Sequence, residues 1–392
     1  MRRSVDRILT THTGSLPRPQ SLVELLLARE SGQPVDAAAL ESEVRSAVSG
    51  IVARQVEAGV DVVNDGEMSK IGYSTYVKER LTGFGGSQTM SQGSSIGPSD
   101  LFDYPNFAQR LMANRAISDL RLPACTGPIE VADREAIQKD IEHLKTAVGG
   151  QQPTDVFMTA ASPGVIALFL ANEYYPSREA YLEAIARAMK DEYNAIVRAG
   201  LVLQLDCPDL AMGRHIQFGQ ASLEEFRRNA ALNVEALNFA VADIPPEQLR
   251  MHLCWGNYEG PHHRDVPLRD IIDIVLTARP SAISLEACNP RHAHEWQVFE
   301  DVKLPEGKVL IPGVIDSTNN YIEHPDLVAQ RIERYAQLVG RENVMAGTDC
   351  GFGTFAGVSM VDPDIAWAKF QSMAAGARRA SDRLWARQLT PA

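Results

Sequence analysis

The residues most suited to chemistry in this sequence are a histidine and a cysteine two positions apart, His252 and Cys254 in the segment MHLCW. The apolar residues around them predict a buried strand, in which residues i and i+2 project to the same face about 6 to 7 Å apart. An imidazole and a thiol at that spacing can bind one metal ion together, although a buried cysteine more often only packs. The motif needs further ligands before it indicates a metal site.

Later strand candidates end in residues of the same kinds. The segment SLEACNP places Glu286 and Cys288 on one face of the next strand, and AGTDCGFG places Cys350 at the end of the last strand. An imidazole, two thiols and a carboxylate form a mixed ligand set that zinc accepts in tetrahedral geometry. Cys288 is either a packing residue or a substitute ligand.

The elements that must position these residues alternate regularly along the chain. Two amphipathic helical patterns end at Gly59 and Gly200, the second beginning at the N-cap candidate Ser177, and a strand follows each at once. The eight apolar runs that we expect to be strands are RILTTHTGS, VDVVNDGE, DVFMTAASPG, LVLQLDCPD, LRMHLCWGN, SAISLEACNP, GKVLIPGVIDS and NVMAGTDCGFG. This repeated unit predicts a single (β/α)8 TIM barrel over residues 1–392, with its chemistry at the carboxyl ends of the strands.

One stretch departs from this pattern. Residues 80–132 are rich in Gly, Ser, Phe and Tyr, and they follow the second expected strand. We expect an insertion that covers one side of the barrel mouth. A surface insertion without a role would explain the composition equally well.

Composition limits the partners. The net charge of −12 argues against a nucleic-acid partner, which clustered Lys and Arg would have to bind. No signal-peptide core or membrane-length apolar run is present, so we expect a cytoplasmic protein without a membrane partner. Five cysteines, an odd number in a long chain, predict free thiols. An enzyme that acts on small-molecule substrates fits this composition best. A homo-oligomer remains possible.

Several motifs together resemble one family. They are HLC, the LE of the following strand and the distant DCG, with TGSLPRP, VNDGE and LQLDCP nearer the N-terminus. In this combination the sequence resembles the catalytic barrel of the cobalamin-independent methionine synthases, a family that includes the epoxyalkane:coenzyme M transferases. The resemblance runs from about residue 9 to about residue 380.

The resemblance implies a metal-dependent alkyl transfer. It makes Zn²⁺ the cofactor and a small-molecule thiol the acceptor of an alkyl group, with homocysteine as the expected thiol and methyl as the expected group. Glu286 is expected to be displaceable, because a carboxylate is the hardest of the four donors. The zinc ligands that the resemblance implies are His252, Cys254, Glu286 and Cys350.

The resemblance also implies an amino-acid site. It places Gly14 and Ser15 at the substrate carboxylate, and Glu67 and Asp206 at the substrate ammonium group. Solvated acids at strand ends are the alternative interpretation of the two carboxylates. Asp65 is expected to be a structural cap.

The sequence departs from the family at the expected proton donor. Where the methionine synthases carry a histidine after the seventh strand, this chain has Thr318, which leaves Asp316 and His12 as candidate catalytic residues. The N-terminal barrel of the long synthases has no counterpart here, so the alkyl donor stays open. Other histidines that could supply a proton are His262, His263, His292 and His294.

Three alternatives remain at this point. Addition of coenzyme M or another small thiol to an epoxide would need a basic contact for an anionic tail, for which Arg18 and Arg214 are candidates. A metal-free barrel of the uroporphyrinogen decarboxylase type would make Cys254 and Cys350 packing residues. A purely structural zinc would be four-coordinate and closed to substrate.

Overall fold

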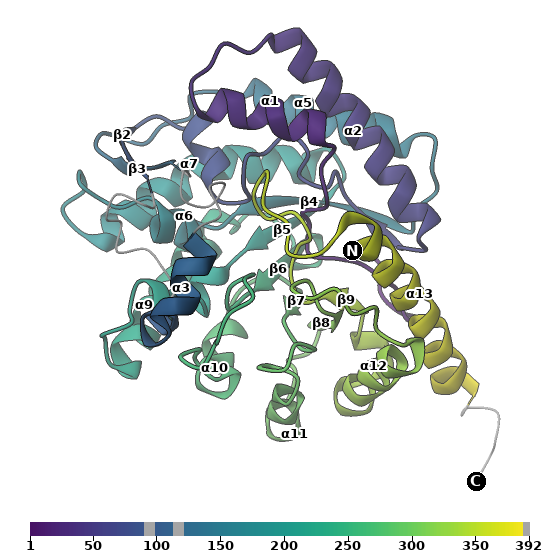
Figure 1. Ribbon diagram of the computed structural model, residues 1–392. Coiled ribbons are helices and arrows are strands. Elements are labelled where there is room, and N and C mark those ends of the chain that lie inside the picture. The colour runs from purple at the N-terminus through teal and green to yellow at the C-terminus, as the bar shows by residue number, and fades with distance from the viewer. Residues whose placement is uncertain (90–98, 113–120, 387–392) are drawn as a thin grey trace.

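Parallel strands form a curled sheet that is ringed by helices (Figure 1). The computed structural model describes residues 1–89, 99–112 and 121–386. The strands follow one another in the order β1-β4-β5-β6-β7-β8-β9, and every neighbouring pair is parallel. Their bounds are β1 Val62–Val63, β4 Asp155–Ala161, β5 Val202–Asp206, β6 Leu249–Leu253, β7 Ala282–Leu285, β8 Val309–Ile315 and β9 Gly347–Thr348. The α/β class and the parallel sheet are as predicted, and the architecture is TIM-barrel-like.

The N-terminal segment lies between the two edge strands of this sheet. The carbonyl oxygen of Leu9 accepts the N–H of Ala346, just before β9, at 2.9 Å, and the N–H of Thr11 donates back to the Ala346 oxygen at 2.8 Å. On its other side, the Thr10 oxygen accepts the N–H of Val62 in β1 at 3.0 Å. Residues 9–11, within the first expected strand, therefore hydrogen-bond to both ends of the seven-stranded ladder.

Helices connect the strands on the outside, as the amphipathic patterns predicted. Ser177 is the N-cap of α7, with its side chain accepting the N–H of Ala180, and Gly59 and Gly200 have φ of 83° and 85° just after α2 and α7. The helices are α1 Gln20–Glu30, α2 Ala37–Glu57, α3 Pro105–Met112, α5 Glu135–Val148, α6 Pro163–Phe169, α7 Arg178–Arg198, α8 Gly213–Ile216, α9 Leu223–Ala240, α10 Ile272–Val275, α11 Val298–Asp301, α12 Pro325–Val339 and α13 Pro363–Ala386.

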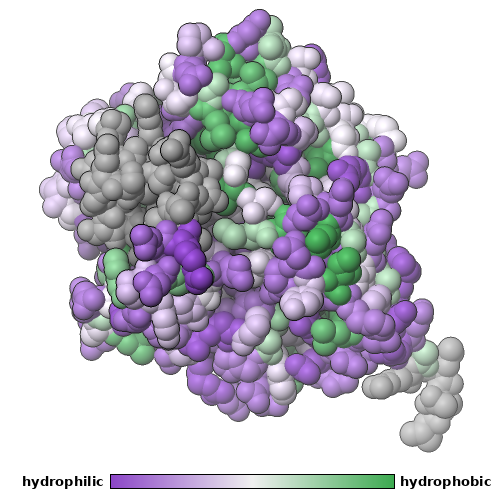
Figure 2. All heavy atoms as spheres, viewed as in Figure 1, coloured by the Kyte–Doolittle hydropathy of each residue, from purple (hydrophilic) through white to green (hydrophobic). Residues whose placement is uncertain are grey.

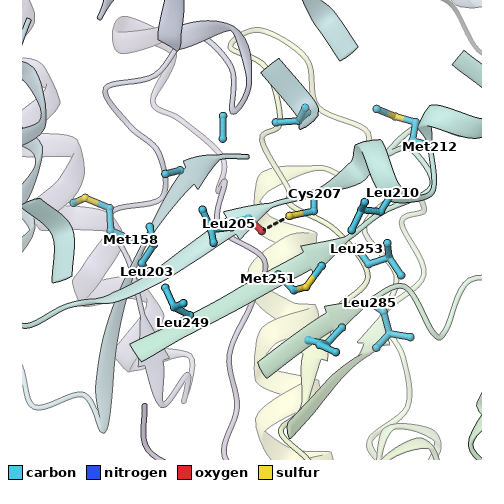
Figure 3. Packing of buried hydrophobic residues seen from close by; sticks show 14 of the residues in the cluster. Met158, Leu203, Leu205, Cys207, Leu210, Met212, Leu249, Met251, Leu253 and Leu285 are labelled. Atoms are coloured by element: carbon cyan, nitrogen blue, oxygen red, sulfur yellow. Dashed lines mark hydrogen bonds between the residues drawn. The ribbon is translucent and has the colours of Figure 1, made fainter. Parts of the chain in front are cut away.

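Alternation along the strands divides apolar from polar side chains. Figure 3 shows Leu203, Leu205 and neighbouring apolar residues from β5, β6 and β7 packed in one buried cluster. The residues between them point to the other face, because successive side chains of a strand alternate. On β5 these are Gln204 and Asp206, and on β6 they include His252. The polar residues of the strand ends are thereby turned into the interior of the curled sheet.

The described parts of residues 80–132 contain a second, smaller sheet. Strand β2 (Phe84–Thr89) pairs antiparallel with β3 (Arg121–Cys125), and a 3-10 helix (Ser99–Asp103) precedes α3. The side chain of Leu101 reaches the cavity described below. The expected insertion as a whole stays a prediction, because residues 90–98 and 113–120 lie outside the described residues.

The face seen in Figure 1 is mostly hydrophilic, with hydrophobic side chains in separate patches, one of them over α1 and α2 (Figure 2). Across the described ranges, every helix is too short or too polar to cross a lipid bilayer.

Candidate metal and substrate site

Three side chains from two strand ends converge in the interior. His252 is the last but one residue of β6, Cys254 follows this strand at once, and Cys350 comes two residues after β9. One potential ligand atom from each residue lies within 4.8 Å of those of the other two. All three side chains are buried, and all three line a single cavity.

The geometry of this trio suits zinc. Cys254 Sγ and Cys350 Sγ are 3.7 Å apart, and two sulfurs bound to one tetrahedral zinc at about 2.3 Å would be about 3.8 Å apart. Nδ1 of His252 is 3.2 Å from Ser284 Oγ, while its Nε2 is buried without a hydrogen-bond partner. Burial and the nearby Arg250 charge lower the pKa of His252 to about 3, so the ring is neutral, as a metal ligand must be.

Glu286, the fourth expected ligand, is beside this trio but not part of it. Its Oε1 accepts the N–H of Trp255 at 2.7 Å, and its Oε2 accepts an amide hydrogen of Asn289 at 2.8 Å. Burial and the charge of Cys254 raise the pKa of Glu286 well above its ordinary value. Both carboxylate oxygens therefore have partners, and direct ligation would require one of them to be exchanged.

Cys288 does not reach the trio. Its side chain is buried outside the cavity lining, and its backbone N–H donates to Asp349 Oδ1 at 3.0 Å. Burial raises the pKa of its thiol well above the ordinary value. Cys288 therefore has the environment of a packing residue.

Two buried carboxylates line the same cavity. Glu67 Oε1 accepts the hydroxyl of Thr159 at 2.9 Å, whereas its Oε2 is buried without a hydrogen-bond partner. Asp206 Oδ1 accepts an amide hydrogen of Gln204 at 2.8 Å, and burial together with the charge of Glu67 raises the pKa of Asp206 well above its ordinary value. Like charges destabilise each other in a buried site, so this pair is suited to a cationic group of a ligand.

The backbone around these carboxylates is tightly constrained. Glu67 has a φ of 59°, which is uncommon for a residue other than glycine, and Asp65 Oδ1 accepts its N–H at 3.0 Å, the contact expected of a cap. Gly14 has a φ of 151°, and a Cβ there would be 2.8 Å from Glu67 Oε1 and 2.6 Å from Thr159 Cγ2. Ser15 lines the cavity next to it. Gly14 thus packs directly behind Glu67.

The candidate proton donors lie outside the cavity lining. Thr13 and Ser15 line the cavity, and the alternation of side chains turns His12, which comes just before Thr13, away from it. The His12 ring packs against Phe157 and Phe370 and hydrogen-bonds to Gln55 of α2 at 2.8 Å. Burial lowers the pKa of His12 to about 3, which makes it a poor proton carrier at neutral pH.

The Asp316 carboxylate accepts hydrogen bonds from its own loop. It accepts both the N–H and the hydroxyl of Thr318 at 2.7 Å, and an amide hydrogen of Asn319 at 2.5 Å. Ser317, between Asp316 and Thr318, is the residue of this loop that lines the cavity.

The two arginines that could bind an anionic tail of a thiol already donate hydrogen bonds to backbone carbonyl oxygens. Arg18 donates to the carbonyl oxygens of Gly353, Glu67 and Lys70, at 2.5, 2.9 and 3.0 Å, and Arg214 donates to that of Phe218. Neither arginine belongs to the cavity lining.

The walls of the cavity were not predicted from the sequence. They are largely aromatic and apolar, and most of them come from loops that lack a periodic pattern, with Phe169 at the end of α6. Asn257, three residues after Cys254, ties these loops together by donating to Gly351 and Thr354 and accepting from Ser317. Its position two residues after HLCW was the available signal. The main wall residues are Tyr73, Phe169, Met212, Tyr258, Phe352 and Phe355.

Comparison with known proteins gives a consistent family. The model of the cobalamin-independent synthase catalytic domain matches residues 164–365, just over half of the chain. The methionine synthase of Saccharolobus solfataricus is 24% identical over 377 residues, which are 96% of this chain and 95% of that protein. The methionine synthase of Thermococcus kodakarensis is 24% identical over 368 residues, covering 94% and 91% of the two chains.

Solved structures share the fold. A B12-independent methionine synthase from Shewanella sp. W3-18-1, in complex with selenomethionine, has a TM-score of 0.74 at 20% identity and covers 97% of this chain and 99% of its own. A putative vitamin-B12 independent methionine synthase from Listeria monocytogenes has a TM-score of 0.62 at 18% identity, with 95% and 98% covered.

Proposed function

The chain belongs to the cobalamin-independent methionine synthase family, and on that premise we propose that it is a (β/α)8-barrel enzyme that transfers a methyl group to the zinc-bound sulfur of an amino-acid thiol, homocysteine. The observation that carries this proposal is the shared cavity. A ligand trio suited to zinc and two buried carboxylates suited to an ammonium group line the same space. An α-amino acid with a thiol side chain has one group for each.

Zinc is the proposed cofactor, with His252, Cys254 and Cys350 as its ligands and Glu286 as a fourth ligand that substrate can displace. When bound, zinc removes the proton of a coordinated thiol and leaves a sulfur that can still attack an alkyl donor. Supporting the exchange of Glu286, its two oxygens already have Trp255 N–H and Asn289 as alternative partners.

The chain's own groups orient the acceptor. Glu67 Oε2, which has no partner, and Asp206 would bind the ammonium group, with Ser15 and the backbone at Gly14 at the carboxylate. The Shewanella relative was solved with selenomethionine, an α-amino acid whose selenium carries a methyl group, which agrees with this class of ligand. The occupied state of Arg18 and Arg214 makes a sulfonate-bearing thiol the weaker candidate.

Zinc analysis combined with calorimetry tests the proposal. Purified wild-type protein should contain stoichiometric zinc, and titration with homocysteine should release a proton as the thiol becomes a thiolate. Coenzyme M, titrated in parallel, should bind more weakly, since it lacks the ammonium group.

Each result has a clear meaning. Carefully prepared wild-type protein without zinc would favour the metal-free barrel, and zinc without proton release on thiol binding would favour a closed structural site. Tighter binding of coenzyme M than of homocysteine would reassign the acceptor.

A further inference from the structure

A second buried cluster surrounds Asp265, in the loop that follows β6. His262 Nδ1 is 2.9 Å and His292 Nε2 is 3.0 Å from Asp265 Oδ2, while His215 Nδ1 is 2.8 Å from Oδ1. The three histidines come from different segments, and the Asp265 side chain is only 1% exposed. The proposed zinc trio shares no residue with this cluster.

The hydrogen-bond pattern leaves each of two rings, if neutral, one N–H donor short. His262 Nε2 faces the carbonyl oxygen of Tyr258 at 3.0 Å, and His292 Nδ1 faces Glu295 Oε2 at 2.9 Å, so an acceptor lies at both nitrogens of each ring. A neutral imidazole has a single N–H. Either both rings carry an additional proton, or a cation lies between the ring nitrogens and Asp265.

The protonated state and the cation-bound state carry the same total charge. Two imidazolium protons contribute the same charge as one divalent cation, and either balances the two carboxylates Asp265 and Glu295. Burial alone would lower the pKa of His292, but the hydrogen bonds to Asp265 and Glu295 raise it to about 10. A metal ion would therefore displace protons that these carboxylates already hold in place.

From this geometry we propose a second metal site, in which His262 Nδ1, His292 Nε2 and Asp265 bind a divalent transition-metal cation, with His215 beside the other oxygen of Asp265. Imidazole with carboxylate is a donor set for zinc and its first-row neighbours rather than for magnesium or calcium. The metal takes the place of the protons on the ring nitrogens that face Asp265 and releases them, so charge and atoms balance.

His215 supplies an independent observation. Both of its ring nitrogens are buried without a hydrogen-bond partner, as is Asp265 Oδ1, although Nδ1 and Oδ1 are only 2.8 Å apart. The outer contacts of His262 and His292, to Tyr258 and Glu295, are the kind that orient metal-binding histidines. The cluster thus has three oriented groups and one unpartnered donor.

The site would hold one wall of the substrate cavity. The loop between Cys254 and Asp265 contains Gly256, Asn257 and Tyr258, which line the cavity. Its first residue, Trp255, stacks on the His292 ring at 4.2 Å. A cation at Asp265 would fix both ends of this loop relative to the proposed zinc trio.

Cobalt(II) titration of the metal-free full chain distinguishes the two sites. Cobalt bound to thiolates gives an intense charge-transfer absorption, whereas cobalt bound by nitrogen and oxygen gives only weak ligand-field bands. We expect the charge-transfer band to saturate with the first equivalent and the ligand-field bands to grow through a second. His262→Ala should remove the second phase alone, and His263→Ala, at an adjacent residue paired with Asp103 instead, should remove neither.

A wild-type titration with one cobalt phase overturns the proposal without relying on any variant. So does an unchanged second phase in a folded His262→Ala protein. Calorimetry in buffers of different ionisation enthalpy provides the second measurement, with proton release expected in the second phase. A wild-type titration that shows the ligand-field phase without the charge-transfer phase would instead count against the proposed zinc trio.

Discussion

Cys254 Sγ lies 3.7 Å from Cys350 Sγ, although 96 positions separate the two residues in the chain. Their strands, β6 and β9, are not neighbours, since β7 and β8 lie between them. Only the curl of the sheet brings the two strand ends together. The distance exceeds the roughly 2.05 Å of a disulfide and agrees with two thiolates that share one zinc.

Replacing one of these cysteines should remove the metal. Cys350→Ser should weaken zinc binding by at least about 100-fold, because loss of an outer contact alone costs about 10- to 100-fold. Inductively coupled plasma measurements after dialysis against a chelator provide the readout. Cys288→Ser, which changes a buried cysteine outside the cavity, is the matched control and should retain zinc. Equal zinc loss in both variants would point to general destabilisation.

Removing one carboxylate should affect only thiols that carry an ammonium group. Asp206→Asn should weaken homocysteine binding by about 10- to 100-fold, the equivalent of a hydrogen bond to a charged group worth roughly 1.5–3 kcal/mol. Binding of 4-mercaptobutyrate, which lacks the amino group, should change little. Calorimetric titration of both thiols into both proteins measures the difference. A parallel loss for both thiols would remove Asp206 from ammonium recognition.

A methyl group at Gly14 should disturb the site through Glu67. Gly14→Ala adds a Cβ within 2.8 Å of Glu67 Oε1 at a φ of 151°, so we expect a loss of roughly 1–3 kcal/mol in unfolding free energy and weaker homocysteine binding. Gly32→Ala is the control for backbone strain, because its φ is 76° and no atom lies within 4 Å of the added Cβ. Urea unfolding and thiol titration separate the effects. Unchanged thiol affinity in Gly14→Ala would show that Glu67 can move freely.

The stability of the fold should decrease from acid toward neutral pH through Asp209. Burial raises the pKa of this carboxyl from 3.8 to about 6, against the hydrogen bonds of Ser162 and Asn233. The folded state therefore holds the proton more tightly than the unfolded chain. The resulting stability is fully present below about pH 4 and is lost as the pH rises to about 6, by roughly 3 kcal/mol at 1.36 kcal/mol per pKa unit.

Asp209→Asn isolates this contribution, since an amide does not titrate. The unfolding free energy of the variant relative to wild type should rise by roughly 3 kcal/mol between about pH 4 and about pH 6.5. Any constant cost of rearranged hydrogen bonds cancels in that comparison. The exposed Asp243, replaced in the same way, is the control. A difference that stays constant across this range would contradict the prediction.

The sequence by itself determined the local geometry. The period of the helical patterns and the alternation along the strands predicted the α/β class, the helix ends at Gly59 and Gly200, and the common face of His252 and Cys254. These features depend on dihedral angles and side-chain direction within a few residues, which periodicity reports directly. The combined motifs also identified the family, which the match over residues 164–365 confirmed.

The tertiary structure decided which distant groups meet. It brought Cys350 to His252 and Cys254, left Glu286 with other partners, and turned His12 toward α2 rather than the cavity. Contacts between strand ends depend on how the sheet curls and how each loop returns, and no local pattern encodes either. For the same reason the cluster of His215, His262 and His292 around Asp265, built from helix α8 and two loops, became visible only in the folded chain.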